Sequence, residues 1–358
     1  MEKEEFIEIV GERIDSLVSL DVQSRNAIRI LYTLAREKSK RPLCLSAASL
    51  LRERVNYRDV VFIATGFPNR PHISHAIFES DGPPGAAALA RALHIGFGAT
   101  PIILTEDGAV ESVSRVIQAT GFRILAPEEA IDTVGHFAII RGASVIGFPA
   151  DDAEAKERAK ELISKYRPVG IVVIEKAGMN EKGVIHGGRG DRNIVMAKID
   201  YLVLEAARGK IATIGIGDGG NELGMGVIQE GLKKSSIPYM AKCQCGCGGG
   251  AAPVTPTDVL ITATVSNWGA YGIAACLAFL LQRPEVFHDA MMEERILEAA
   301  ANAALIDGGT GYCLPGADRL SSDGHQAIVT LLGQIVSHGV RVLQKGDALP
   351  GGDKDYRA

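Results

Sequence analysis

Short runs of apolar and β-branched residues alternate with longer amphipathic segments along most of this chain, and this alternation limits its fold more than any other feature. The runs lie at residues 59–65, 100–106, 143–149, 169–175, 210–216 and 258–264. Strands that alternate with helices in this way form parallel sheets through crossover connections. We therefore predict an α/β fold with a mostly parallel, doubly wound sheet and helices on both of its faces.

The first 40 residues show a different pattern. Phe6, Val10, Ile14 and Leu17 follow one another at helical spacing, and the pattern continues after a polar break. The last dozen residues are polar. We expect three parts: a helical N-terminal segment at residues 1–45, one α/β domain at residues 46–345, and a polar tail at residues 346–358.

Composition excludes several classes of partner and compartment. The net charge of -5 leaves no basic field for nucleic acid, and the apolar stretch at residues 269–281 is shorter than the roughly 20 residues that a membrane span needs. The first 20 residues lack the pattern of a secretory signal, and the six cysteines do not suggest a disulfide scaffold in a chain of 358 residues. We expect a cytoplasmic protein with no nucleic-acid or membrane partner, and a homo-oligomer stays open.

The sequence KIATIGIGDGGNELGMG is the most informative motif. An apolar strand runs into a loop in which six glycines are interleaved with Asp218, Asn221 and Glu222. Glycines let a backbone approach a ligand closely, and a helix predicted from about Val227 would offer free N–H groups to an anion. The three side chains carry hard oxygen donors, which suit Mg²⁺ or Mn²⁺. A simple turn would need fewer glycines, and it would not need three side chains with oxygen donors.

Other loops at predicted strand ends are also polar, and each allows an ordinary structural interpretation. The segment ESDGPPG holds Glu79 and Asp81, although Asp81 could merely cap the following helix. The segment VSNWGAYG holds Ser266 and Asn267, which could cap the long apolar helix that follows them.

The region after the fourth apolar run combines charged and nucleophilic residues. Arg189 could grip a carboxylate through its two-pronged guanidinium, and His186 could act as an acid or base or simply lie at the surface. Farther along, the sequence CQCGC places cysteines at 243, 245 and 247 without an obvious fourth metal ligand. We interpret these thiols as incidental features of a glycine-rich loop.

The motifs ATGFP, ESDGPPGA, IEKAG with a later RGD, GIGDGGNELGMG and VSNWGAYG occur in this order between about Thr65 and about Asp323. Together they resemble the carboxy-terminal domain of D-glutamate cyclases. The resemblance implies a hydro-lyase that converts D-glutamate to 5-oxo-D-proline and water. Known members carry a further amino-terminal domain, which residues 1–45 do not replace, and the CQCGC loop is not part of the family pattern.

The implied reaction suggests roles for the residues of these motifs. We hypothesise that Glu79, Asp81, Asp218 and Glu222 are catalytic, and that Asp218, Asn221 and Glu222 hold a divalent Mg or Mn ion or the substrate ammonium. Arg189 would bind the α-carboxylate of the substrate. The substrate-binding residues would be Thr65, Gly66, Glu175, Arg189, Gly219, Gly220, Asn221, Ser266 and Asn267.

Two other functions remain open at this point. The chain could be a carboxylate-binding module without catalysis, or a Mg-dependent phosphatase-like enzyme, because GDGGNE resembles the GDGxND loop of such phosphatases. The phosphatase interpretation is weaker because the sequence lacks the upstream DxDx(T/V) motif. We expect no organic cofactor, since GIGDGG does not have the spacing of a dinucleotide fingerprint. The expected partner is a small carboxylate, D-glutamate or an analogue.

Overall fold

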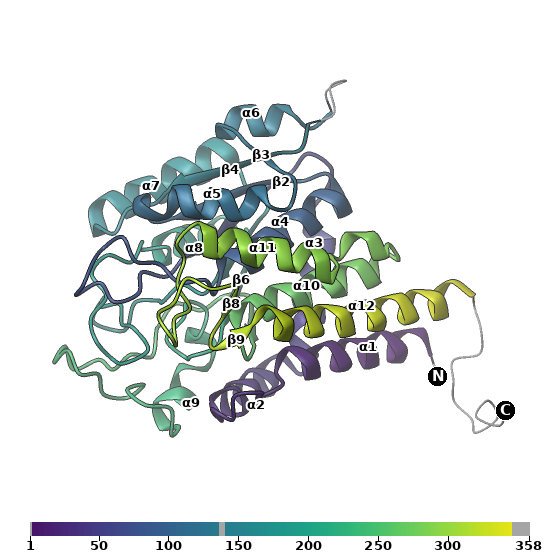
Figure 1. Cartoon of the computed structure of the whole chain (residues 1–358). Helices are drawn as coiled ribbons and strands as arrows, with labels where there is room; N and C mark the ends of the chain where they lie inside the picture. The colour runs from purple at the N-terminus through teal and green to yellow at the C-terminus, as the bar shows by residue number, and fades with distance from the viewer. Residues whose placement is uncertain (1, 136–139, 346–358) are drawn as a thin grey trace.

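A computed structural model describes residues 2–135 and 140–345 (Figure 1). Its main sheet has seven strands in the order β3-β4-β2-β1-β5-β6-β7, and every pair of neighbours is parallel. The strands are β1 (Val60–Ala64), β2 (Thr100–Thr105), β3 (Arg123–Ile124), β4 (Gly142–Gly147), β5 (Gly170–Ile174), β6 (Ala212–Gly217) and β7 (Val259–Thr262). A small antiparallel pair, β8 (Gly316–Ala317) and β9 (Leu320–Ser321), lies apart from it. The predicted α/β class and the parallel sheet are confirmed.

Helices cover both faces of the sheet. They are α1 (Lys3–Val18), α2 (Ala27–Ser39), α3 (Leu43–Arg54), α4 (Pro83–Phe97), α5 (Val110–Gln118), α6 (Pro127–Asp132), α7 (Asp152–Tyr166), α8 (Asp200–Arg208), α9 (Gln229–Lys234), α10 (Ser266–Leu280), α11 (Ala290–Asn302) and α12 (Ser322–Lys345). Successive side chains of β1 enter two separate cores: Val61 and Ile63 pack toward α4 and α10, while Phe62 packs toward α7 and α8. Burial on both faces explains why the strand sequences are apolar throughout.

The N-terminal helices belong to the larger of these cores. Phe6 of α1 packs edge-on against Phe279 of α10, with 6.2 Å between ring centroids. Asp15 of α1 accepts hydrogen bonds from the backbone N–H groups of Leu43 and Cys44, at 2.6 and 3.0 Å, and so caps α3. The expected boundary at residue 45 falls inside α3, and the expected tail at residues 346–358 lies outside the described residues.

The order of the strands fixes where a ligand can bind. The chain begins the sheet at β1 in the centre, builds outward through β2 to β4 and β3, and then returns to the other side of β1 with β5, β6 and β7. The carboxyl ends of β1 and β5 therefore lie at a reversal of strand order. Connections leave such a point in opposite directions, which opens a crevice for ligands.

One helix of the described chain, α12, is long and apolar enough to cross a membrane by length and composition alone. It runs beside α1 in Figure 1, and Leu332, Val336 and Val340 are buried in the larger core. Packing against α1, α10 and α11 accounts for this apolar stripe without a membrane.

Candidate active site

A pocket of about 360 Å³ lies at the reversal point, beyond the carboxyl ends of β1, β5 and β6. This volume falls within the range of small-molecule sites. Its lining includes many of the residues predicted from sequence: Glu79, Glu175, Arg189, Asp218, Gly219, Asn221 and Glu222. The structure therefore brings together loops that lie up to 143 positions apart in the chain, from Glu79 to Glu222.

Buried carboxylates dominate the floor of the pocket. Glu79, Glu175 and Asp218 are each exposed by 7% or less. Burial raises the pKa of all three well above the ordinary range, and the charges of neighbouring carboxylates raise it further. Oxygen atoms of Glu175, Asp218 and Glu222 lie within 4.8 Å of one another, and so do those of Asp81, Asp218 and Asp318. Such an arrangement favours a bound cation or bound protons.

Asp81 and Asn267 exchange caps between two helices. Asp81, which precedes α4, accepts hydrogen bonds from the N–H groups of Ser266 and Asn267 at 2.9 Å each and so caps α10. Asn267, in the first turn of α10, accepts from the N–H groups of Gly82 and Gly85 at 2.9 and 2.7 Å and so caps α4. Each residue therefore caps the helix that begins beside the other residue. The sequence had suggested that each would cap the helix that directly follows it.

The remaining predicted residues of these loops lie behind the pocket wall. The Ser266 hydroxyl donates to Glu175 and holds its carboxylate in place. The carbonyl of Gly66 accepts from the Lys176 ammonium at 2.8 Å, and Lys176 also forms a buried ion pair with Glu106. Thr65 is fully buried. Burial likewise raises the pKa of Asp81, to about 8, with Asp318 adding to the effect.

The loop after β6 folds back on itself. Glu222 accepts hydrogen bonds from the N–H groups of Gly219 and Gly220, at 2.7 Å each. A Cβ atom on Gly217 would lie 2.6 Å from a Glu222 carboxylate oxygen, and Gly220 has a φ of +98°. The glycines therefore make room for Glu222 and for a left-handed turn.

The helix predicted from about Val227 was expected to offer free N–H groups to an anion, but the N–H groups of Val227 and Ile228 donate to the carbonyls of Gly224 and Met225 at 3.1 and 3.0 Å. Glu222 already occupies the N–H groups of Gly219 and Gly220. The predicted helix from about Val227 begins as a single 3-10 turn, Gly226–Ile228, followed by the six-residue α9. Glycine spacing alone could not reveal that a side chain of the same loop binds its N–H groups.

The wall that carries Arg189 is tied to the same loop. The side-chain amide of Asn221 donates to the carbonyl of His186 at 3.0 Å. The chain from His186 then turns through Gly187 and Gly188 to Arg189, whose exposed side chain lines the pocket mouth. The position of Arg189 thus depends on the loop after β6.

Sequence reasoning missed several lining residues. Arg25, between α1 and α2, lies 3.4 Å from a carboxylate oxygen of Asp218 and 2.8 Å from one of Asp318. Asp218 raises the pKa of the Arg25 guanidinium, so Arg25 stays charged. Other missed lining residues include Gln23, Asn69, Arg70, Asp318 and Arg319. These positions stand outside the glycine-rich motifs, and only the folded chain brings them to the pocket.

The fold and the pocket define a doubly wound α/β protein with a carboxylate-rich site at its strand-order reversal. Residues 14–333 match the family described as D-glutamate cyclase-like, C-terminal, and the chain belongs to this family. It is also similar to human "D-glutamate cyclase, mitochondrial", with 29% identity over 230 residues. That match covers 62% of this chain and 33% of the human protein, so the chain spans about a third of this relative.

Proposed function

We propose that this chain is a D-glutamate cyclase-like hydro-lyase that converts D-glutamate to 5-oxo-D-proline and water. The observation that carries the proposal is the composition of the pocket. Buried carboxylates form its floor, while Arg25, Arg70, Arg189 and Arg319 also contribute to its lining. A substrate with one ammonium and two carboxylate groups is complementary to such a site. The family and the human relative support the same reaction class.

Cyclisation needs two proton transfers, and the pocket offers groups for both. The substrate nitrogen bonds to the γ-carboxyl carbon and gives up two protons, and one γ-oxygen leaves with two protons as water. Asp218, whose raised pKa makes its carboxylate a stronger base, would accept a proton from the ammonium. Burial raises the pKa of Glu79 and favours its protonated form, which would donate a proton to the departing oxygen. The second proton of the nitrogen would return to Glu79, and Asp218 would pass its proton to the oxygen, which leaves as water. Arg189 would bind the α-carboxylate.

A divalent ion fits the donor set as well as an ammonium does. Glu175, Asp218 and Glu222 bring three carboxylate oxygens within 4.8 Å of one another, and hard oxygen donors suit Mg²⁺ or Mn²⁺. When bound there, such an ion would polarise the γ-carboxyl group as a Lewis acid. Asn221, predicted as a further ligand, also lines the pocket.

Proton NMR of the purified chain with D-glutamate or L-glutamate, with and without Mg²⁺ or Mn²⁺, tests this proposal. We expect 5-oxoproline to form from the D-isomer alone. Thermal stabilisation by D-glutamate without turnover would instead support a binding module of the same family. Absence of both turnover and binding would overturn the proposed substrate.

A further inference from the structure

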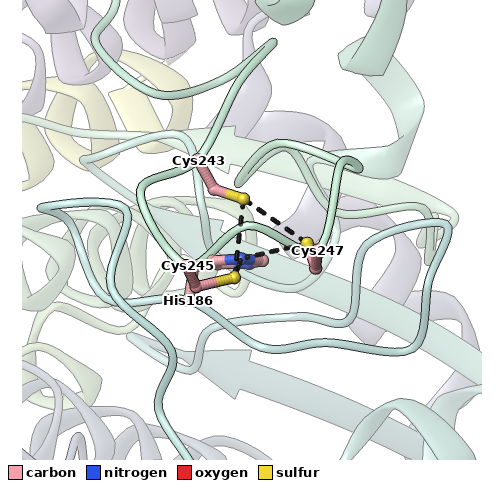
Figure 2. A group of neighbouring side chains, drawn as sticks. All are labelled: His186, Cys243, Cys245 and Cys247. Atoms are coloured by element: carbon pink, nitrogen blue, oxygen red, sulfur yellow. Dashed lines mark hydrogen bonds between the residues drawn. The ribbon is translucent and has the colours of Figure 1, made fainter.

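The cysteines of the CQCGC loop converge on a histidine from a distant part of the chain (Figure 2). Cys243, Cys245 and Cys247 surround the imidazole of His186, which lies nearly 60 positions earlier. The four potential ligand atoms all lie within 4.8 Å of one another. The interpretation of these thiols as incidental overlooked His186, because nothing in the local sequence connects the two segments.

The distances match those of a tetrahedral zinc site. Zinc lies about 2.3 Å from sulfur and about 2.0–2.1 Å from histidine nitrogen, so neighbouring ligand atoms in a tetrahedron are ~3.8 Å apart for two sulfurs and ~3.6 Å apart for sulfur and nitrogen. Cys243 Sγ lies 3.5 Å from Cys245 Sγ and 3.4 Å from Cys247 Sγ. His186 Nε2 lies 3.2 Å from Cys245 Sγ and 3.6 Å from Cys247 Sγ. A disulfide would need about 2.05 Å, so the sulfurs form no such bond.

The surroundings of the cluster also favour a metal. The His186 imidazole is fully buried, and within the described chain its hydrogen-bonding partners are the cysteine sulfurs at Nε2. The Asn180 amide and the Gly249 N–H both donate to Cys247 Sγ, at 3.3 and 3.4 Å. Donors aimed at a sulfur stabilise its thiolate form, which is the form that binds metal.

We propose that His186, Cys243, Cys245 and Cys247 bind one structural Zn²⁺ ion. Four protein ligands leave no open coordination position, as in structural rather than catalytic zinc sites. None of the four residues lines the pocket in the part of the chain that the structure describes. This site is separate from the acidic cluster and would bind zinc through sulfur and nitrogen, whereas the acidic cluster offers only oxygen.

The position of the site gives the zinc a function. It joins the CQCGC loop to the segment that runs from His186 to Arg189, and the Gln244 N–H donates to the Gly190 carbonyl at 2.9 Å beside it. The carbonyl of His186 also accepts the hydrogen bond from Asn221. Zinc would therefore fix the pocket wall that presents Arg189.

The direct test is the metal content of the purified full-length chain, measured by elemental analysis. We expect about one zinc per chain in the wild type and in Cys313→Ser, a matched control because Cys313 is an exposed free thiol outside the cluster. His186→Ala and Cys247→Ser should lose at least about nine-tenths of the zinc. Zinc-free wild type, or zinc retained in both cluster variants, would overturn the proposal.

Thiol reactivity of the folded wild type provides a test that does not depend on variants that fold. Cys245 and Cys313 are both exposed, so free thiols at both positions should react rapidly with a thiol reagent. A zinc-bound Cys245 should be protected until a chelator is added, while Cys313 should react at once. Equal reaction rates without chelator would contradict the site, and so would an iron–sulfur chromophore or a disulfide between the loop cysteines.

Discussion

The acidic pocket and the cysteine–histidine cluster share the segment that begins at His186, yet they are built in different ways. The pocket gathers carboxylates with like charge, and burial raises the pKa of Glu79, Glu175 and Asp218. The cluster gathers three sulfurs and one nitrogen within 4.8 Å of one another. Crowded carboxylates cost stability unless a cation or protons compensate them, which is typical of functional sites. Three thiols and an imidazole that converge on one point instead favour a metal that stabilises the fold.

The largest effect on catalysis is expected from Asp218 in the pocket, whereas a carboxylate on the outer surface should have none. Asp218→Asn removes the proposed proton acceptor and should lower kcat for 5-oxoproline formation by roughly 10²- to 10⁴-fold. Proton NMR measures the rate, and circular dichroism checks that the fold is kept. Glu294→Gln, an exposed position on α11, is the matched control and should leave kcat unchanged. A fully active Asp218→Asn variant would remove Asp218 from the mechanism.

Arg189 tests the charge complementarity of the pocket. Loss of its charged hydrogen bonds should raise KM for D-glutamate in Arg189→Ala by about 10- to 100-fold, with a smaller change in kcat. Arg189→Lys should keep the charge but lose the two-pronged geometry, so its KM should be intermediate. Arg192→Ala is the control, because Arg192 is exposed nearby and does not line the pocket. Equal KM values in Arg189→Ala and Arg192→Ala would contradict the assignment.

Loss of the zinc site should have a smaller effect, on the binding of D-glutamate in the acidic pocket. If zinc holds the wall that carries Arg189, Cys247→Ser should raise KM for D-glutamate by up to about 10-fold while kcat changes little. Steady-state kinetics of Cys247→Ser and of the control Cys313→Ser provide the comparison. An unchanged KM in zinc-free Cys247→Ser would mean that the two clusters act independently.

The pH dependence of stability tests the buried carboxylates around the pocket. Burial raises the pKa of Asp81 from 3.8 to about 8, so between these values the folded chain binds more protons than the unfolded chain. Stability should therefore fall as pH rises from about 4 to about 8, and the slope should be smaller in Asp81→Asn. Thermal unfolding at pH 5.5 and pH 8 measures this, with an expected difference in Tm of a few degrees. A steeper slope in Asp81→Asn would show that Asp81 does not make stability fall as pH rises.

The same measurement can detect a cation in the acidic pocket. Burial raises the pKa of Glu175 and Asp218, so a lower pH favours their protonated forms, and a divalent ion must displace those protons to bind. Added Mg²⁺ or Mn²⁺ should therefore raise Tm more at pH 8 than at pH 5.5. Equal increases in Tm at both pH values would place the ion outside the acidic pocket.

Much of the fold and part of the site could be predicted from sequence because they depend on local patterns. Apolar runs next to amphipathic helices define a parallel sheet, and the polar residues after each run must then meet at one edge of it. This logic brought Glu79, Glu175 and Asp218 to the pocket. It could not find Arg25 or Asp318, because neither follows a strand of the main sheet.

The sequence alone thus determined the class of fold, the glycine-rich loop and the acidic character of the site. Tertiary structure decided which groups pair across long separations: Asp81 with α10, Asn267 with α4, and His186 with the cysteines of the CQCGC loop. The physical reason is that secondary structure follows the period of neighbouring residues, whereas a cap or a metal ligand needs only proximity in space. Proximity between distant segments is created by packing of the whole chain, and no local pattern records it.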